Sequence, residues 1–178
     1  MSQEKSWYTL LTRSRFETVV FKDIQKKSIE AFLPKIKKRS GRKDRRTMID
    51  VPLFPGYLFV NITLDPHEQL SVLKTMGAVR LLGYSSGPVP VPSPHIESLK
   101  IITQSGLDVI SGSINTLKQG EKMLVVRGPF SGITGEFLRY KGQDRVIVKI
   151  ETLGQFAGVE IDRQDLEAVS HIMPNSLT

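Results

Sequence analysis

The chain of 178 residues contains no cysteine, only one tryptophan and no long apolar run. Without cysteine it has no disulfide framework, no thiolate nucleophile and no cysteine-ligated zinc or iron–sulfur site. No stretch approaches the ~20 consecutive apolar residues that a membrane-spanning helix needs. The first residues also lack the apolar segment of a secretory signal. These absences predict a cytoplasmic protein that does not enter a membrane.

Signatures of catalysis are also missing. The three histidines, His67, His95 and His171, are far apart in the chain, and none has a partner at the spacing of metal ligands. The chain contains no nucleophile elbow of the G-x-S-x-G type, no P-loop and no G-x-G-x-x-G segment. We therefore predict a protein that is not an enzyme and that binds no metal and no cofactor.

Positive charge is concentrated in one segment. The net charge of the chain is +7, and the twelve residues from Lys35 to Arg46 hold eight basic residues and a single acid. The net charge of the rest of the chain is therefore zero. A basic segment of this kind indicates a local contact with a polyanion, although a solvated loop kept soluble by its charge would look the same.

The first hundred residues show a mixed pattern of helices and strands. Apolar residues at helical spacing follow Ser14 and Glu17, which form a capping-box signature, and further helix starts are expected at Asp65-Pro66 and Ser93-Pro94. The expected strands are 7–11, 57–62 and 79–82, and segments 32–39 and 45–51 are expected to pair as a hairpin with a basic tip. This order predicts an α+β sandwich, with helices packed against an antiparallel sheet.

The remainder of the chain shows a different pattern of apolar and polar residues. The apolar pattern weakens between residues 106 and 117, which indicates a linker. Short alternating segments follow, and they predict a small closed β-barrel. The expected strands are 123–127, 134–140, 145–150, 159–161 and 166–169.

Three segments, taken in order, resemble one family. They are Trp7-Tyr8, the run from Leu53 to Tyr57 (L-F-P-G-Y) and the glycine-rich turn from Gly128 to Gly135. Each alone fits a core strand with a tight entry turn or a plain hairpin. Together they resemble the NusG family of transcription elongation factors, possessing an N-terminal NGN domain (6–105), a linker (106–117) and a C-terminal KOW domain (118–170). The resemblance implies a monomeric transcription elongation or antitermination factor.

The resemblance implies that the NGN domain binds the clamp helices of the largest subunit of RNA polymerase. The implied contact residues are Tyr8, Leu53, Phe54, Pro55, Tyr57 and Phe59. Strand alternation puts Tyr57 and Phe59 on one face and Leu58 and Val60 on the other. We expect the first pair to be exposed to the polymerase and the second pair to face the helices.

The resemblance also implies contacts with upstream non-template DNA or RNA and with a further partner. The candidate nucleic-acid contacts are Arg13, Lys26, Lys27, Lys74 and, in the basic segment, Arg42, Lys43, Arg45 and Arg46. These cations favour phosphate contact over base reading. The KOW positions that contact a ribosomal protein or the termination factor Rho in the family correspond to Phe130, Ile133 and Leu153.

The C-terminal part departs from the housekeeping pattern of the family. Leu153-Gly154-Gln155 and Gly158-Val159-Glu160 stand where F-G-R and P-V-E are typical. This departure favours a specialised paralogue of the RfaH or LoaP type, while the strongly β-forming run from Val146 to Ile150 argues against a switch of the barrel to helices. Two other classes remain open: a KOW-type RNA-binding protein of the ribosome or of RNA processing, and a purely structural adaptor.

Overall fold

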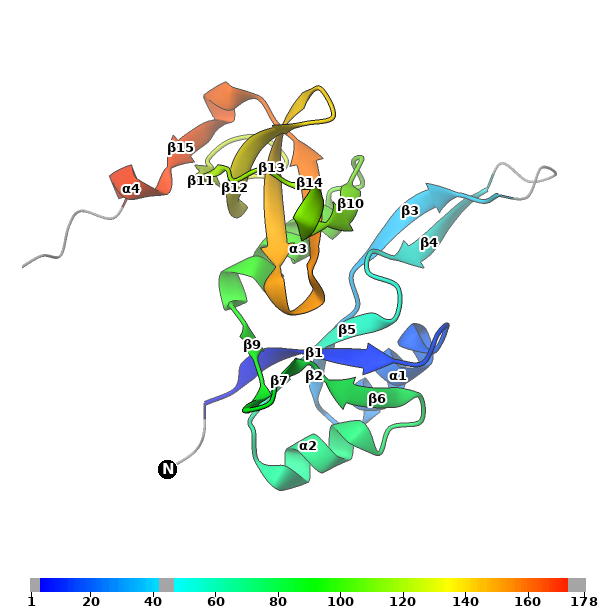
Figure 1. Cartoon of the computed structure of the whole chain (residues 1–178). Coiled ribbons are helices and arrows are strands. Elements are labelled where there is room, and N and C mark those ends of the chain that lie inside the picture. The colour runs from blue at the N-terminus through cyan, green and yellow to red at the C-terminus, as the bar shows by residue number, and fades with distance from the viewer. Residues whose placement is uncertain (1–3, 42–46, 173–178) are drawn as a thin grey trace, which may run out of the picture. The chain divides into compact units, whose positions relative to one another are not determined.

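The computed structural model describes residues 4–41 and 47–172, and the chain divides into two compact units, 1–93 and 94–178. Figure 1 labels the elements along the chain. The helices are α1 (Glu17–Lys26), α2 (Pro66–Leu73), α3 (Ser93–Gln104) and the short α4 (Val169–Ile172), with 3-10 turns at Ile114–Thr116, Glu151–Leu153 and Arg163–Asp165. Arg42, Lys43, Arg45 and Arg46 lie outside the described residues.

The strands of the first unit form one larger sheet and two ribbons. The strands are β1 (Ser6–Thr12), β2 (Glu30–Phe32), β3 (Lys35–Arg39), β4 (Met48–Pro52), β5 (Tyr57–Ile62), β6 (Ala78–Leu81), β7 (Gly83–Tyr84), β8 (Gly87–Pro88) and β9 (Pro90–Val91). The larger sheet has the order β2-β5-β1-β6, and β9 also pairs with β1. All its pairs are antiparallel, and β3–β4 is the predicted hairpin.

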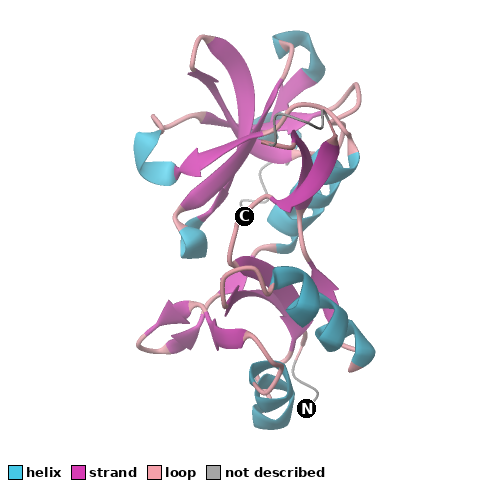
Figure 2. Cartoon of the chain, turned by 90° about the vertical axis from the view of Figure 1, so that its right-hand side faces the viewer, coloured by secondary structure: helices cyan, strands magenta, loops and turns pink. Residues whose placement is uncertain are grey.

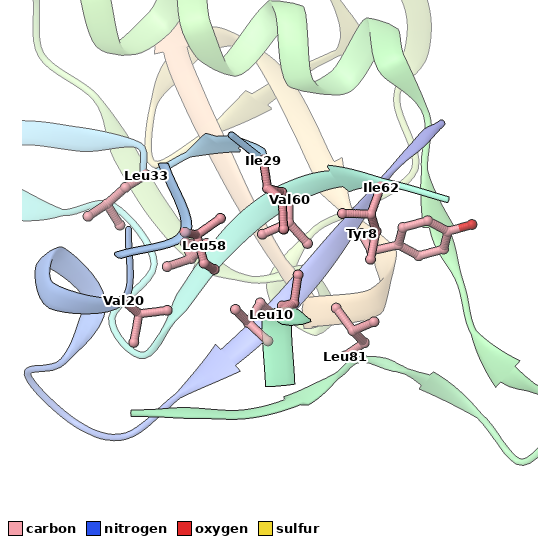
Figure 3. Packing of buried hydrophobic residues seen from close by; sticks show 11 residues of the cluster. Tyr8, Leu10, Val20, Ile29, Leu33, Leu58, Val60, Ile62 and Leu81 are labelled. Carbon is pink, nitrogen blue, oxygen red and sulfur yellow. The ribbon is translucent and has the colours of Figure 1, made fainter. Parts of the chain in front are cut away.

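One face of this sheet is covered by α1 and α2. Leu10 lies opposite Leu58 across the β1–β5 pair, so both side chains point to the same face. They belong to a buried apolar cluster that also takes in Val20 and Ile24 of α1 and Val72 of α2. Figure 3 shows the strand members of this cluster pointing toward one another. The expected inward orientation of Leu58 is confirmed.

Helix α2 begins as the sequence predicts. Asp65 precedes it, and its Oδ1 accepts hydrogen bonds from the backbone N–H groups of His67 (2.9 Å) and Glu68 (3.3 Å). Pro66 occupies the first turn, where its missing N–H costs no helical bond. Helix α1 lacks the expected capping box. No side chain caps its first turn, and the Glu17 carboxylate accepts the N–H of Gly56 instead.

The second unit is built mainly of strands, as Figure 2 shows. Its strands are β10 (Ile110–Ser113), β11 (Glu121–Val125), β12 (Thr134–Tyr140), β13 (Gln143–Ile150), β14 (Gln155–Glu160) and β15 (Leu166–Ala168). They form one antiparallel sheet in the order β10-β14-β13-β12-β11-β15. Within the described residues this order runs between two edge strands, so the expected closed barrel is not shown.

The segment expected as a linker, 106–117, contains strand β10 and a 3-10 turn. Strand β10 pairs with β14 over four residues, from Ile110–Gly158 to Ser113–Gln155. Ile110 and Leu117 pack against the buried cluster of Leu138, Ile147 and Phe156. The sequence did not predict this strand because glycine and serine mask the alternation of its apolar residues. Helix α3, expected in the first domain, falls in the second unit from Pro94 onward.

Candidate functional site

The Pro55-Gly56 turn is held by hydrogen bonds on both sides of Gly56. The carboxylate Oε1 of Glu17 accepts the Gly56 N–H at 2.7 Å. The carbonyl oxygen of Gly56 accepts the backbone N–H of Thr12 at 2.8 Å and the Thr12 hydroxyl at 3.2 Å. Glu17 and Thr12 are themselves buried. The turn is therefore fixed to the end of β1 and to the start of α1.

Glycine is required at this turn because its φ is +86°, in the left-handed region that other residues adopt only at a cost. A Cβ at Gly56 would meet no atom within 4 Å, so conformation and not space selects glycine. The N–H of Tyr57 then donates to the carbonyl of Phe54 at 3.1 Å, which closes the turn and starts β5.

The turn separates exposed from buried members of the motif. Pro55 is exposed and Tyr57 is half-buried, whereas Leu53, Phe54 and Phe59 are buried. The expectation of an exposed ring at Phe59 is therefore wrong: its exposed fraction is 0%. The ring of Phe32 stacks on Phe59 at 6.1 Å, and the ring of Phe54 meets it edge-on at 6.5 Å.

Tyr8 does not join Tyr57. It lies opposite Val60 in the β1–β5 register, and it is a buried member of the cluster under α1 and α2. Figure 3 shows its ring at the border of that cluster. Thr9 and Leu11 are the β1 residues opposite Phe59 and Tyr57. Because side chains alternate along a strand, Tyr8 must point to the other face.

Three candidate nucleic-acid contacts gather beside one cavity of about 310 Å³ between α1 and α2. Lys26, Lys27 and Lys74 line it, together with Asp23, Thr75 and Met76. The Lys27 ammonium already donates to the carbonyl oxygen of Ser71 (2.7 Å) and to the hydroxyl of Thr75 (2.8 Å). The Lys26 ammonium pairs with the Asp23 carboxylate at 2.9 Å.

Arg13 and Lys74 are exposed, and both lie near the loop after α2. The backbone N–H of Arg13 donates to the carbonyl of Gly77 at 2.8 Å, three residues beyond Lys74. Gly77 has φ +93°, and a Cβ there would come within 2.5 Å of the Phe16 ring. The close approach of these two loops requires glycine and brings Arg13 to this end of the unit.

In the second unit, two of the three predicted partner contacts are buried. The exposed fraction is 4% for Phe130 and 0% for Ile133, while Leu153 is partly exposed. The glycine-rich turn folds back on its own strand, because the N–H of Gly132 donates to the carbonyl of Val125 and the N–H of Val125 donates to the carbonyl of Ile133, both at 2.8 Å. The expectation that Phe130 and Ile133 present their side chains to a partner is not met here.

Among the described residues, two ionisable groups, His95 and Glu68, have clearly shifted pKa values. Burial disfavours the charged form of His95 and lowers its pKa, with Glu151 opposing and Lys122 adding to this effect. Burial tends to raise the pKa of Glu68, but hydrogen bonds from Thr63 (2.6 and 2.9 Å) and the charge of Lys5 outweigh it, so the pKa is lowered.

Comparison with known proteins supplies the family. The family described as "Transcription termination factor nusG" matches residues 5–100, more than half of the chain. The chain belongs to the NusG family. The transcription termination/antitermination protein NusG of Bacillus subtilis is 26% identical over 171 residues, covering 89% of this chain and 96% of that protein. The protein of that name from Thermus thermophilus is 28% identical over 151 residues, with coverages of 78% and 80%.

The fold comparison agrees with this membership. A solved structure titled "Domain interaction in Thermotoga maritima NusG" aligns with a TM-score of 0.52 at 22% identity, covering 93% of this chain and 98% of that one. The NusG family consists of transcription factors and not of enzymes. Among the described residues, no helix is long and apolar enough to cross a membrane, and no group of three or more acidic or histidine side chains is placed to hold a metal ion.

Sequence reasoning missed the two residues that fix the turn in this NusG-family chain. Glu17 was expected to complete a capping box with Ser14, and instead it binds Gly56, 39 positions along the chain. The clue in the sequence was that Glu17 lies one helical turn before the apolar residue Val20, which is buried. A carboxylate on the buried side of a helix rarely lacks a partner. Thr12 carried no signal, because threonine is common in strands.

Proposed function

We propose that this protein is a transcription elongation and antitermination factor that binds RNA polymerase through the Pro55–Tyr57 turn. The proposed partner surface is the clamp helices of the largest subunit. Pro55 and Tyr57 make the contact, and Leu53, Phe54 and Phe59 form the apolar layer that supports them. The bound protein favours processive elongation. It acts as a monomer in the cytoplasm.

One observation carries this proposal: the turn is anchored on both sides of Gly56 before any partner binds. The contacts of Gly56 with Glu17 and Thr12 span 2.7 to 3.2 Å. A contact loop that is fixed in advance loses little conformational entropy on binding. Tyrosine suits such a surface because it offers a large contact area with few rotatable bonds. Membership of the NusG family supplies the kind of partner.

The second unit has the role of recruiting a further factor. Among the three predicted positions, Leu153 is the one that is partly exposed, at the turn between β13 and β14. Gly154 closes that turn with φ +62°. We propose Leu153 as the first contact of a ribosomal protein or of the termination factor Rho.

Arg13 and Lys74 complete the proposed surface of the first unit. Both side chains are exposed. We assign them to the phosphates of upstream non-template DNA or of RNA, since lysine and arginine contacts of this kind add affinity without choosing a sequence. Lys26 and Lys27 are weaker candidates for phosphate contact, because each ammonium already has a partner within the unit.

The test is binding of the purified full-length protein to core RNA polymerase, with Tyr57→Ala as the variant. We expect at least a tenfold loss of affinity, which is the loss of about 1.4 kcal/mol of binding free energy. The matched control is Tyr84→Ala, which removes another tyrosine of the first unit whose exposed fraction is 72%. The control should bind as the wild type does.

Two results would contradict the proposal. In one, Tyr57→Ala and Tyr84→Ala bind polymerase equally well. In the other, the wild-type protein purifies from a lysate with ribosomal particles and without polymerase, which would favour a KOW-type RNA-binding protein. Thermal denaturation of both variants checks that a loss of binding does not come from unfolding.

A further inference from the structure

Strands β3 (Lys35–Arg39) and β4 (Met48–Pro52) form a two-stranded ribbon that is separate from the larger sheet. Figure 1 shows this ribbon extending away from β1 and β5. Its five cross-strand pairs run from Lys35–Pro52 to Arg39–Met48. The N–H of Ser40 donates to the carbonyl of Thr47 at 2.9 Å, so the pairing continues one step beyond the strands.

The ribbon has two unlike faces. Directly paired residues point to the same side, and successive residues point to opposite sides. The first face therefore carries Lys37, Arg39 and Met48, with Asp50 opposite Lys37. We call it the Arg39 face. The second face carries Lys38 opposite Ile49 and the half-buried pair of Ile36 and Val51.

Among the described residues, Lys37 and Arg39 on the Arg39 face form no ion pair. Both are exposed. Other lysines are already paired, such as Lys100 with Glu97 at 2.9 Å and Lys149 with Glu136 at 2.8 Å. The Arg39 face therefore holds positive charge that is available to an outside anion.

An exposed apolar side chain lies among these charges. Met48 is 52% exposed and directly opposite Arg39 in the register. A solvated loop that serves only for solubility gains nothing from an exposed methionine. A surface that reads base edges gains from both residues: arginine donates two hydrogen bonds to guanine, and an apolar side chain contacts the thymine methyl group.

The base of the ribbon is tied to the proposed polymerase-binding motif. The N–H of Leu53 donates to the carbonyl of Pro34 at 2.8 Å, directly below the Lys35–Pro52 pair. Leu53 is buried, and it begins the segment that leads into the Gly56 turn. The base of the ribbon is thus joined by a hydrogen bond to the segment that leads into the Gly56 turn.

We propose that the Arg39 face of this ribbon enters the major groove of duplex DNA. The two strands lie ~4.8 Å apart and five residues extend ~17 Å. A major groove ~12 Å wide and ~8.5 Å deep admits a two-stranded ribbon. The deep, narrow major groove of an RNA helix does not. The assignment rests on the proposed function, in which this unit works next to upstream DNA.

The first test measures the binding of full-length protein to a labelled DNA duplex of about 20 base pairs at several salt concentrations, without polymerase. Each phosphate contact contributes about 0.9 to the slope of log affinity against log salt. Lys37→Ser should lower that slope by about 0.9, whereas Arg39→Ser should weaken binding with a smaller change in the slope, because Arg39 contacts base edges. The matched controls are Lys38→Ser, on the other face, and Lys118→Ser with Lys122→Ser in the second unit.

The second test asks whether the ribbon is in the major groove. Replacing every thymine base of the duplex by uracil removes the C5-methyl group, which lies only in the major groove. We expect the wild-type protein to lose affinity two- to fivefold. The variant Met48→Ser should bind both duplexes equally, because it has lost the side chain that contacts the methyl.

Four results would overturn the proposal. Three of them are equal binding to an RNA duplex of the same sequence, an equal loss of slope in Lys38→Ser and Lys37→Ser, and no effect of uracil substitution on binding by the wild type. A fourth is a loss of binding by Lys37→Ser with Arg39→Ser to core polymerase free of nucleic acid, which would place the ribbon on the enzyme. Tyr57→Ala tests the proposed function separately, since it should leave DNA binding intact.

Discussion

The larger sheet and the ribbon of the first unit differ in what their side chains do. In the sheet, Leu10, Leu58 and Val60 are fully buried, and each is held by the cluster under α1 and α2. In the ribbon, Met48 and Ile49 are 52% and 43% exposed. The sheet therefore supplies the stability of the unit, whereas the ribbon presents side chains that the fold itself does not need.

The same difference holds for the charged residues. Glu17 at the start of α1 is buried and accepts the N–H of Gly56. Lys27 joins α1 to the end of α2 through Ser71 and Thr75. Lys37 and Arg39 make no such contact within the described residues. Charges that hold the fold and charges that are free for a partner are thus separated in space.

The largest effect on stability is expected from the sheet. Leu58→Ala removes a fully buried side chain, and we expect it to lower the free energy of unfolding by about 3 kcal/mol. Urea denaturation of the full-length protein measures this. A loss below about 1 kcal/mol would contradict the assignment of Leu58 to the core of the first unit.

A smaller loss is expected from the anchor of the turn. Glu17→Ala leaves the Gly56 N–H without its acceptor, and we expect a loss of about 1–3 kcal/mol together with weaker polymerase binding. Glu17→Gln keeps an acceptor oxygen and should restore most of both. Equal behaviour of the two variants would show that the hydrogen bond does not hold the turn.

A pH-dependent effect is expected in the second unit, from His95. Burial lowers the pKa of His95 below its ordinary 6.5, so the unfolded chain binds this proton more readily than the folded one. Stability should therefore fall as the pH falls below about 6.5, until the folded pKa is reached. His95→Gln should flatten this dependence in thermal denaturation between about pH 5 and 8. An unchanged dependence would contradict the assigned burial.

The smallest effect on stability is expected from the basic segment at the tip of the hairpin. We expect replacement of Arg42, Lys43, Arg45 and Arg46 by serine to leave the free energy of unfolding within about 0.5 kcal/mol per residue. The same variant should flatten the salt dependence of complex formation with polymerase and DNA. An unchanged salt slope would contradict a nucleic-acid contact and would favour the alternative, a solvated loop.

Local signals in the sequence predicted much of the fold. The run from Tyr57 to Ile62 is a strand with the expected bounds, and Asp65-Pro66 starts α2 as expected. The hairpin of β3 and β4 was predicted from two extended segments on either side of the basic residues. In each case the residues that form the element also carry its signal, through alternation, capping or turn chemistry.

The features that the sequence did not predict depend on contacts between residues far apart in the chain. The role of Glu17 depends on Gly56, and the face of Tyr8 depends on its register with Val60. Strand β10 forms because β14 offers it an edge to pair with. A single-residue pattern contains none of this information. The burial of Phe59, Phe130 and Ile133 was missed for the same reason.

The proposed contact between the Pro55–Tyr57 turn and the clamp helices of RNA polymerase can be tested by photo-crosslinking. A photo-crosslinking residue is placed at position 57 of the full-length protein, in a complex with paused polymerase. We expect a crosslink that maps to the clamp helices of the largest subunit, and none from the same residue placed at position 84. A crosslink from position 57 to another surface, or equal crosslinks from both positions, would contradict it.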